Sequence, residues 1–262
     1  MRKIHVKEKK GTESETIIFV HGNSSSSNIF DKIFDLSEMP YNLLSFDLSG
    51  HGLSEKSGDY TVDSLKEDIH QVLNKVQGEI ILIGHSLGGH LIIEIAQELK
   101  NLKGLAIFGT PPLKKPVNFG EAFKANPHSN TLFMENPSDE QLSLFLDDVV
   151  TNKEVIPLIR KDYLDTDPKI RSAIAAGLAT PDTLQDERNI FLSLEIKKFI
   201  LHGEADSLIS LEYLKKMQED ANESFEIFVI PECGHYPTIE QPGVFLKYLN
   251  IICNSTFQLT IK

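Results

Sequence analysis

The chain has 262 residues, of which 40% are hydrophobic and 24% charged, so it is long enough to bury a sizeable core in one large domain. Its formal net charge of −12 opposes extended contact with nucleic acid or with an anionic membrane surface. No apolar run reaches the roughly 18 residues that a spanning helix needs, and the basic N-terminus lacks the apolar stretch of a signal peptide, so we expect a cytoplasmic protein.

Short apolar runs recur along the chain and predict strands buried on both faces of a mostly parallel sheet. Helical patterns with one apolar stripe separate several of them, so the alternation predicts an α/β fold. The predicted strands cover residues 16–20, 41–47, 79–84, 102–109, 197–203 and 225–231. The predicted helices of this part cover residues 61–76, 87–99, 209–220 and 241–253.

The alternation of strands and helices stops between residues 111 and 196. This region has sequence patterns typical of helices and no convincing strand. A structureless connection of 86 residues would be unusual, so we expect a helical lid over a site, with stretches at 136–150 and 152–178. The chain would then divide into a core at 1–110 and 197–262 and a lid at 111–196. The tail 255–262 alternates apolar and polar residues and suggests an edge or self-association strand.

The sequence GHSLGG at residues 84–89 places Ser86 between a predicted strand and a predicted helix. Gly-x-Ser-x-Gly in this setting is typical of a nucleophile elbow, a strained turn in which glycines allow close backbone approach. A serine hydroxyl is a weak nucleophile and needs a histidine base oriented by an acid.

Two later loops offer the base and the acid, each following a predicted strand. Asp206 follows the strand 197–203, and His235 follows the strand 225–231. Both loops then lie at the carboxyl edge of the sheet, on the same side as Ser86. Glu204 is the alternative acid. An oxyanion also needs two backbone N–H donors, for which we expect Leu87 after the nucleophile and Asn23 in the loop HGNSSSS, with Ser24 as an alternative to Asn23.

Several motifs together resemble the α/β-hydrolase superfamily, in the serine hydrolase branch with a helical cap. These are HGN (21–23), FDLSGHGLS (46–54), GHSLGG (84–89), HGEAD (202–206) and GHYPTIEQP (234–242). The resemblance implies an eight-stranded, mostly parallel sheet, a triad of Ser86, Asp206 and His235, and a cap at 111–196. It also implies that His51, His21 and His202 shape loops, whereas His85 and His90 face either the pocket or a packing interface.

We therefore expect a serine hydrolase that cleaves a small or medium carboxylic ester through an acyl-enzyme, with no metal or cofactor. C–C bond hydrolysis, lactone opening, acyl transfer and a ligand-sensing role remain alternatives. We expect the aromatic side chains between 119 and 163 to form mostly cap core, and Arg160, Asp162, Asp165 and Arg171 to form a solvated face, with substrate recognition as the alternative. Cys233 is expected to be a small buried residue, and the oligomeric state stays open.

Overall fold

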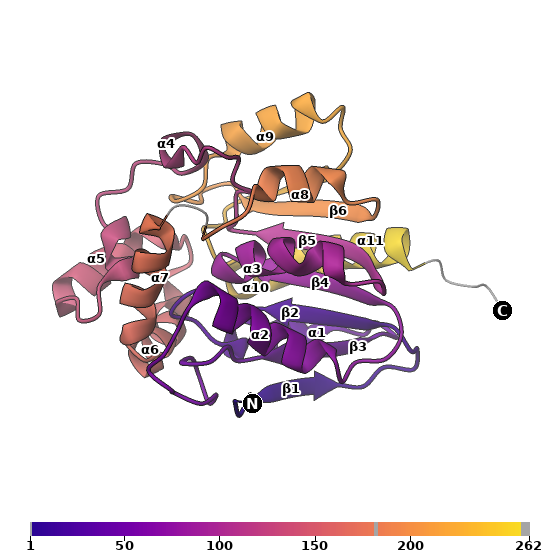
Figure 1. The fold of residues 1–262 in the computed structure, drawn as a ribbon, viewed down its shortest axis with the longest axis horizontal. Helices are drawn as coiled ribbons and strands as arrows, with labels where there is room; N and C mark the ends of the chain where they lie inside the picture. The colour runs from indigo at the N-terminus through magenta and orange to yellow at the C-terminus, as the bar shows by residue number, and fades with distance from the viewer. Residues whose placement is uncertain (1, 181–182, 258–262) are drawn as a thin grey trace.

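The computed structural model describes residues 2–180 and 183–257 and contains one sheet within them. Figure 1 shows its strands side by side through the centre of the molecule. Their order is β1-β3-β2-β4-β5-β6-β7. All neighbouring strands are parallel except β1 and β3, which pair antiparallel. The strands are β1 (Val6–Lys9), β2 (Thr16–Val20), β3 (Asn42–Phe46), β4 (Ile80–His85), β5 (Leu102–Phe108), β6 (Lys197–Gly203) and β7 (Glu226–Ile230).

The predicted α/β class is confirmed, and the apolar runs explain the sheet. Every residue of β2 and β4 is buried, as expected of central strands that are covered on both faces. The expected eighth strand is not found in the described residues. The predicted strands missed β1, because its sequence VKEK is charged and partly exposed, as an edge strand can be.

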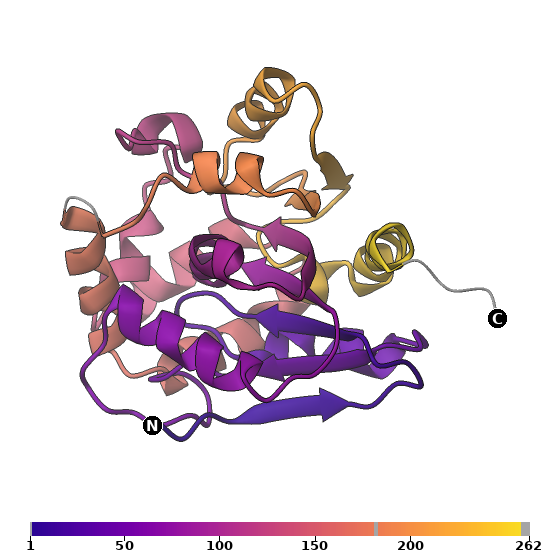
Figure 2. The ribbon, with the colours of Figure 1, turned by 45° about the vertical axis from the view of Figure 1, so that its right-hand side comes forward.

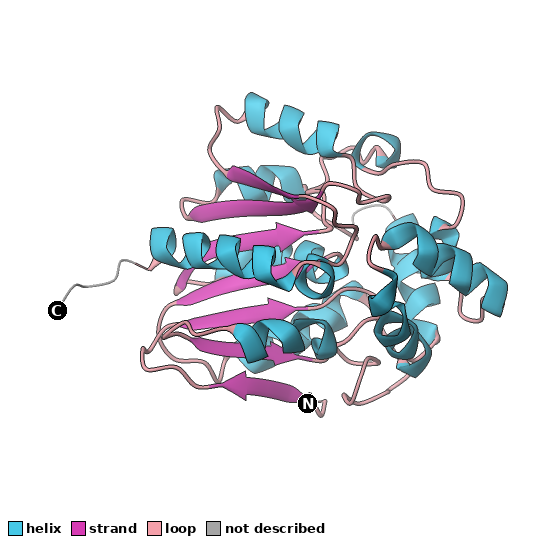
Figure 3. Cartoon of the chain, turned by 180° about the vertical axis from the view of Figure 1, so that it is seen from behind, coloured by secondary structure: helices cyan, strands magenta, loops and turns pink. Residues whose placement is uncertain are grey.

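Helices cover both faces of the sheet. Figure 1 shows α2, α3 and α8 in front of it, and Figure 3 shows the opposite face, where α1 and α11 lie. Thr61 caps α2 by accepting a hydrogen bond from the Ser64 N–H. The bounds are α1 (Asp31–Leu36), α2 (Val62–Leu73), α3 (Leu87–Ile95), α8 (Glu187–Ser193), α9 (Leu211–Asp220), α10 (Pro237–Glu240) and α11 (Pro242–Thr256), with the 3-10 turns η1 (Ser27–Phe30) and η2 (Ala96–Glu98).

The remaining helices gather beyond the carboxyl ends of the parallel strands, as Figure 2 also shows. They are α4 (Phe119–Ala122), η3 (Ser129–Phe133), α5 (Asp139–Val149), η4 (Lys153–Val155), α6 (Ile156–Asp165) and α7 (Lys169–Ala179). The described part of 111–196 contains no strand, as predicted. The single helical stretch expected at 152–178 is instead broken between α6 and α7, where Pro168 precedes α7. α8 packs against α3 in the core layer.

The C-terminal tail begins as helix, because Ser255 and Thr256 are the last residues of α11. The ring of Phe257, the next residue, packs on Tyr41. The prediction of a strand at 255–262 is therefore wrong for its first three residues, and residues 258–262 lie outside the described part. Among the described residues no helix is both long and apolar enough to cross a membrane.

Candidate active site

Ser86 occupies a strained turn between β4 and α3. Its φ of 49° and ψ of −121° fall in a region that non-glycine residues rarely adopt. The second residue on either side of Ser86 is a glycine because there is no room for a side chain. A Cβ on Gly88 would lie 2.4 Å from the Val20 carbonyl oxygen, and one on Gly84 would lie 2.6 Å from Gly89 Cα. The Ser86 N–H donates to the Phe108 carbonyl at 2.9 Å. The core strands thus hold this serine in the geometry of a nucleophile elbow.

The structure brings Asp206 and His235 into direct contact. His235 Nδ1 donates to Asp206 Oδ2 at 2.9 Å, and both side chains are buried. Burial by itself would raise the pKa of Asp206, but the neighbouring His235 and the hydrogen bonds from His235 and Leu208 hold it at about 2. Glu204, the alternative acid, is exposed, and its carboxylate accepts instead from the Glu232 N–H. The buried carboxylate therefore fixes Nδ1 as the protonated nitrogen that faces Asp206.

Ser86 and His235 line the same cavity, which has a volume of about 470 Å³. Gly109 lies against the histidine ring at a positive φ of 62°, and a Cβ there would lie 2.6 Å from His235 Cε1. His85 Nε2 donates to the His235 carbonyl oxygen at 3.1 Å, and burial lowers the pKa of His85 well below its usual value. His85 is thus a neutral support for the His235 loop, a role that the sequence pattern did not distinguish from facing the pocket.

The expected oxyanion donors belong to two segments that adjoin the serine. Leu87 is the first residue of α3, where an N–H has no partner within the helix. A Cβ built on Gly22 would lie 2.9 Å from Ser86 Cβ, so the loop containing Asn23 packs directly on the serine. The Ser24 N–H already donates to His51 Nε2 at 3.2 Å, which favours Asn23 over Ser24 as the second donor.

The loop from 23 to 28 is attached to the helical segment 111–196 by polar contacts. Asp162 of α6 is buried and accepts from Ser26 Oγ at 2.7 Å and from Asn28 Nδ2 at 3.0 Å. Arg171 of α7 is also buried and donates to Ser24 Oγ at 3.3 Å. The prediction that Asp162 and Arg171 lie on a solvated face is therefore wrong, because both side chains are buried and form hydrogen bonds inside the protein.

Arg160 and Asp165 behave as expected of a helix surface. Arg160 pairs with the exposed Asp139 at 2.7 Å, and the exposed Asp165 pairs with Lys161. Asn23 Nδ2 adds another attachment of the 23–28 loop by donating to the Leu132 carbonyl oxygen at 2.9 Å.

The His235 loop is attached to the same helical segment. The His235 N–H donates to the Val149 carbonyl at 2.8 Å. The buried carboxylate of Glu240 accepts from the Gly234 N–H at 3.1 Å and from the Thr151 N–H at 2.7 Å. Sequence reasoning missed Glu240, although its position five residues after His235 in the GHYPTIEQP motif was visible.

The Asp206 loop is attached mainly through backbone groups. The Lys124 N–H donates to the Leu208 carbonyl at 2.8 Å, and the Ser210 N–H donates to the Ala122 carbonyl at 3.0 Å. Lys124 Nζ also donates to the carbonyl oxygen of Asp206. Each loop that accompanies the serine is therefore bonded to the helical segment.

The cavity is mainly apolar, and its polar exceptions are few. Aromatic rings were expected mostly in the cap core; Phe145 and Tyr163 are buried, but three others line the cavity. The polar lining consists of Ser86, His90, Lys124, Ser129 and His235. The apolar lining consists of Gly109, Phe119, Phe123, Leu132, Phe133, Ala175, Leu178, Ala179, Leu208 and Ile209.

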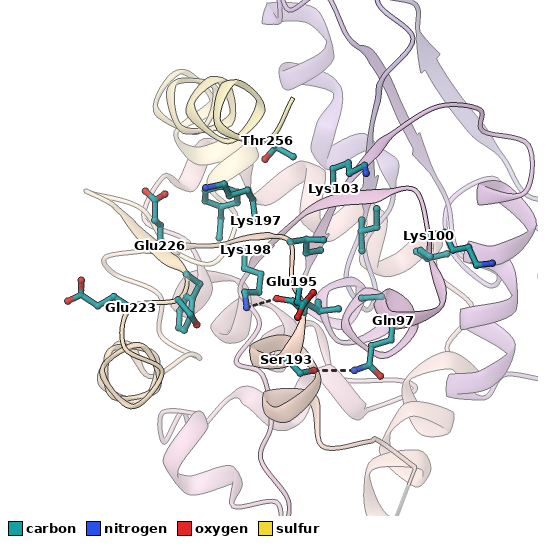
Figure 4. A pocket seen from close by; sticks show the side chains of 18 residues that line it. Gln97, Lys100, Lys103, Ser193, Glu195, Lys197, Lys198, Glu223, Glu226 and Thr256 are labelled. Atoms are coloured by element: carbon teal, nitrogen blue, oxygen red, sulfur yellow. Dashed lines mark hydrogen bonds between the residues drawn. The ribbon is translucent and has the colours of Figure 1, made fainter. Parts of the chain in front are cut away.

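A second cavity of about 870 Å³ lies where β5, β6 and β7 begin, at the edge of the sheet opposite Ser86 (Figure 4). Its lining carries lysines and glutamates, and the buried Lys198 donates to the carbonyl oxygens of Leu192 and Leu194. Neither Ser86 nor His235 reaches it. We therefore assign the chemistry to the smaller cavity.

Other reactive groups in the described residues do not form a competing site. No group of three or more His, Cys, Asp or Glu side chains there is arranged to hold a metal ion. Cys233 is fully buried, and burial raises the pKa of its thiol, which disfavours the reactive thiolate.

Known proteins support the assignment of the fold and the class. The chain is 26% identical over 256 residues to a pimeloyl-[acyl-carrier protein] methyl ester esterase of Nitrosomonas europaea, covering 94% of this chain and 98% of the relative. The crystal structure of the N-acyl homoserine lactonase AidH complexed with N-butanoyl homoserine superposes with a TM-score of 0.85 at 25% identity, covering 98% and 94% of the two chains. A thermophilic esterase of Thermogutta terrifontis superposes with a TM-score of 0.79 at 20% identity, covering 97% and 94%.

The sequence model of the alpha/beta hydrolase family matches residues 17–247, which include the strands β3 to β7, nearly all of β2, the elbow and the loops of Asp206 and His235. The chain therefore belongs to the alpha/beta hydrolase family of enzymes.

Proposed function

We propose that this protein is a serine hydrolase that cleaves a small or medium carboxylic ester through an acyl-enzyme intermediate. The observation that carries the proposal is that Ser86, on its strained turn, and His235, bonded to Asp206, line one cavity. Ser86 is the nucleophile, His235 the general base, and Asp206 the residue that orients the ring.

The reaction proceeds in two stages. His235 accepts the Ser86 proton through Nε2 while Oγ attacks the ester carbonyl carbon, and the alkoxide oxygen of the tetrahedral intermediate accepts from the Leu87 and Asn23 N–H groups. The proton passes to the leaving alcohol as the C–O bond breaks. His235 then deprotonates a water molecule, which attacks the acyl-enzyme and releases the acid and Ser86.

The shape of the cavity limits the substrate. A volume of about 470 Å³ suits a small molecule, and its apolar lining favours an acyl group with an aliphatic or aromatic body. We infer that residues 111–196 serve as the cap over this cavity, because they supply most of its apolar lining.

A lactone is a second candidate substrate. A lactone is a cyclic ester, so the same attack, oxyanion and deacylation steps open it, with the alcohol remaining in the product. The observation that favours it is the high structural similarity to a lactonase, at 25% identity over nearly the whole chain.

The testing experiment is labelling with a fluorophosphonate probe, read by intact-protein and peptide mass spectrometry, together with turnover of p-nitrophenyl esters of increasing acyl length. We expect one adduct on Ser86, multiple turnovers by the wild type, and loss of both in Ser86→Ala. Circular dichroism and thermal unfolding check that this variant stays folded. Unchanged turnover by Ser86→Ala, or labelling at another residue, would contradict the proposal.

A further inference from the structure

A second histidine–carboxylate pair lies in the same cavity as Ser86. His90 Nδ1 lies 2.8 Å from Glu187 Oε2 and 3.0 Å from Oε1. His90 lines the cavity, and Glu187 is fully buried behind it. The proposed ester cleavage uses neither residue.

The contacts of Glu187 define the hydrogen-bonding state of the His90 ring. Its Oε2 also accepts from the Leu113 N–H at 3.0 Å. A carboxylate only accepts, so His90 Nδ1 carries the hydrogen of the shared bond. When Nε2 carries no hydrogen it is an acceptor, and the described residues form no hydrogen bond with it. Besides His235 Nε2, which the proposed reaction uses, the cavity lining therefore offers a second acceptor nitrogen without a partner among the described residues.

His90 is also correctly placed to meet a substrate held on Ser86. Ser86 is the N-cap of α3, and the His90 N–H donates to its carbonyl oxygen at 3.3 Å, so His90 lies about one helical turn, roughly 5 Å, beyond Ser86. That separation corresponds to a group only a few bonds from the scissile carbonyl carbon. A ligand bonded to Ser86 would bring such a group to His90.

A purely structural role, in which the pair joins α3 to α8, explains these contacts less well. Glu94 of α3 already accepts from the Gln185 N–H at 2.6 Å, just before α8. A contact that only connects two helices also does not require the His90 ring to line a mainly apolar cavity.

We propose that His90, positioned by Glu187, is a specificity-determining residue whose Nε2 accepts a hydrogen bond from an N–H or O–H group of the substrate. This inference rests on the proposed ester hydrolysis at Ser86 and narrows its substrates. They are esters or lactones whose acyl part carries an amide N–H or a hydroxyl group within a few bonds of the scissile carbonyl.

The test uses pairs of methyl esters that differ by replacement of N–H with CH₂. The pairs are N-acetylglycine against 4-oxopentanoate, N-acetyl-β-alanine against 5-oxohexanoate, and N-acetyl-4-aminobutanoate against 6-oxoheptanoate. Turnover is followed by pH-stat, and the affinity for each intact ester is measured by calorimetry on Ser86→Ala. We expect the wild type to favour the N–H member of at least one pair about tenfold in kcat/KM, mainly through KM, and Ser86→Ala to show a matching preference in affinity.

His90→Asn is the matched variant, because its side-chain amide can still donate to Glu187 but places no acceptor where Nε2 lies. We expect the preference to fall to about one in His90→Asn and to be partly restored in His90→Gln, whose longer side chain reaches the position of Nε2. A structural role predicts the same preference in all three proteins, and that result would overturn the inference.

The two readouts separate this inference from the proposed function. Turnover without any preference for N–H esters overturns the role of His90 and leaves ester hydrolysis intact. Binding preference in Ser86→Ala that disappears on adding His90→Asn, without turnover by the wild type, supports His90 and rejects ester hydrolysis. Equal binding of both members of every pair to Ser86→Ala counts against His90 whatever the turnover.

Discussion

The serine and its partners are held in place by different parts of the chain. Core elements hold the turn at Ser86: the Ser86 N–H donates to the Phe108 carbonyl, Thr110 Oγ1 donates to the Ser86 carbonyl at 2.8 Å, and Gly88 fits against Val20. The loops that carry Asn23, Asp206 and His235 are instead bonded to the helical segment 111–196. In the proposed mechanism the core therefore positions the nucleophile, and the segment helps to position the groups that activate it.

This difference gives the segment a role beyond supplying most of the apolar lining of the cavity. Asp162, Glu240 and the backbone around Lys124 each connect one of the three loops to it. A displacement of the segment would then disturb the proposed Asn23 oxyanion donor and the His235–Asp206 pair, while Ser86 and Leu87 kept their conformation. Substitutions in the core around Ser86 and at the contacts with the segment should consequently have different effects on activity and stability.

The largest effect is expected from breaking the elbow with Gly88→Ala. The added methyl group would lie 2.4 Å from the Val20 and 2.5 Å from the His21 carbonyl oxygens, and neither backbone can retreat easily within the sheet. We expect kcat/KM to fall roughly 10²- to 10³-fold and the free energy of unfolding to fall by about 3 kcal/mol. Ester turnover and urea unfolding measure the two quantities.

Gly243→Ala is the matched control for that substitution. Gly243 lies exposed in the first turn of α11, and a Cβ there meets no atom within 4 Å. We expect its activity and its stability to equal or slightly exceed those of the wild type. If Gly88→Ala behaved like Gly243→Ala, the elbow would not depend on the close approach of β2.

An intermediate effect is expected from Asp162→Ala, which releases the 23–28 loop from α6. Loss of the carboxylate leaves Ser26 and Asn28 without their buried acceptor and frees the loop that carries the Asn23 N–H. We expect kcat to fall roughly 10- to 100-fold with little change in KM, because the oxyanion donor acts mainly in the transition state.

A trifluoromethyl ketone, which forms a tetrahedral adduct with serine, gives a direct readout of that effect. Its inhibition constant should rise in Asp162→Ala in parallel with the loss of kcat/KM. Asp165→Ala, on the same helix but exposed, serves as the control and should change neither quantity. A rise in KM alone would mean that Asp162 shapes the cavity and not the oxyanion loop.

The contrast between core and segment also explains what could be predicted from the sequence. GHSLGG identified Ser86 because an elbow needs glycines at fixed spacing, and the order of strands located Asp206 and His235 as neighbours. Asp162 and Arg171 have no local signal for their bonds to the 23–28 loop, since Ser26 and Ser24 lie more than 130 residues away in the sequence. The strand β1 escaped prediction because an edge strand needs no continuous apolar run.

The smallest effect is expected from Lys124→Met, at the attachment of the Asp206 loop. This loop and the segment are joined by the backbone bonds Lys124 N–H to Leu208 and Ser210 N–H to Ala122, which a side-chain substitution leaves in place. Only the bond from Lys124 Nζ to the Asp206 carbonyl is lost, so we expect kcat/KM to fall about two- to threefold. Lys100→Met, in the cavity at the opposite edge of the sheet, should have no effect on turnover. A loss from Lys124→Met as large as that from Asp162→Ala would mean that the ammonium group, and not the paired backbone, holds the Asp206 loop to the segment.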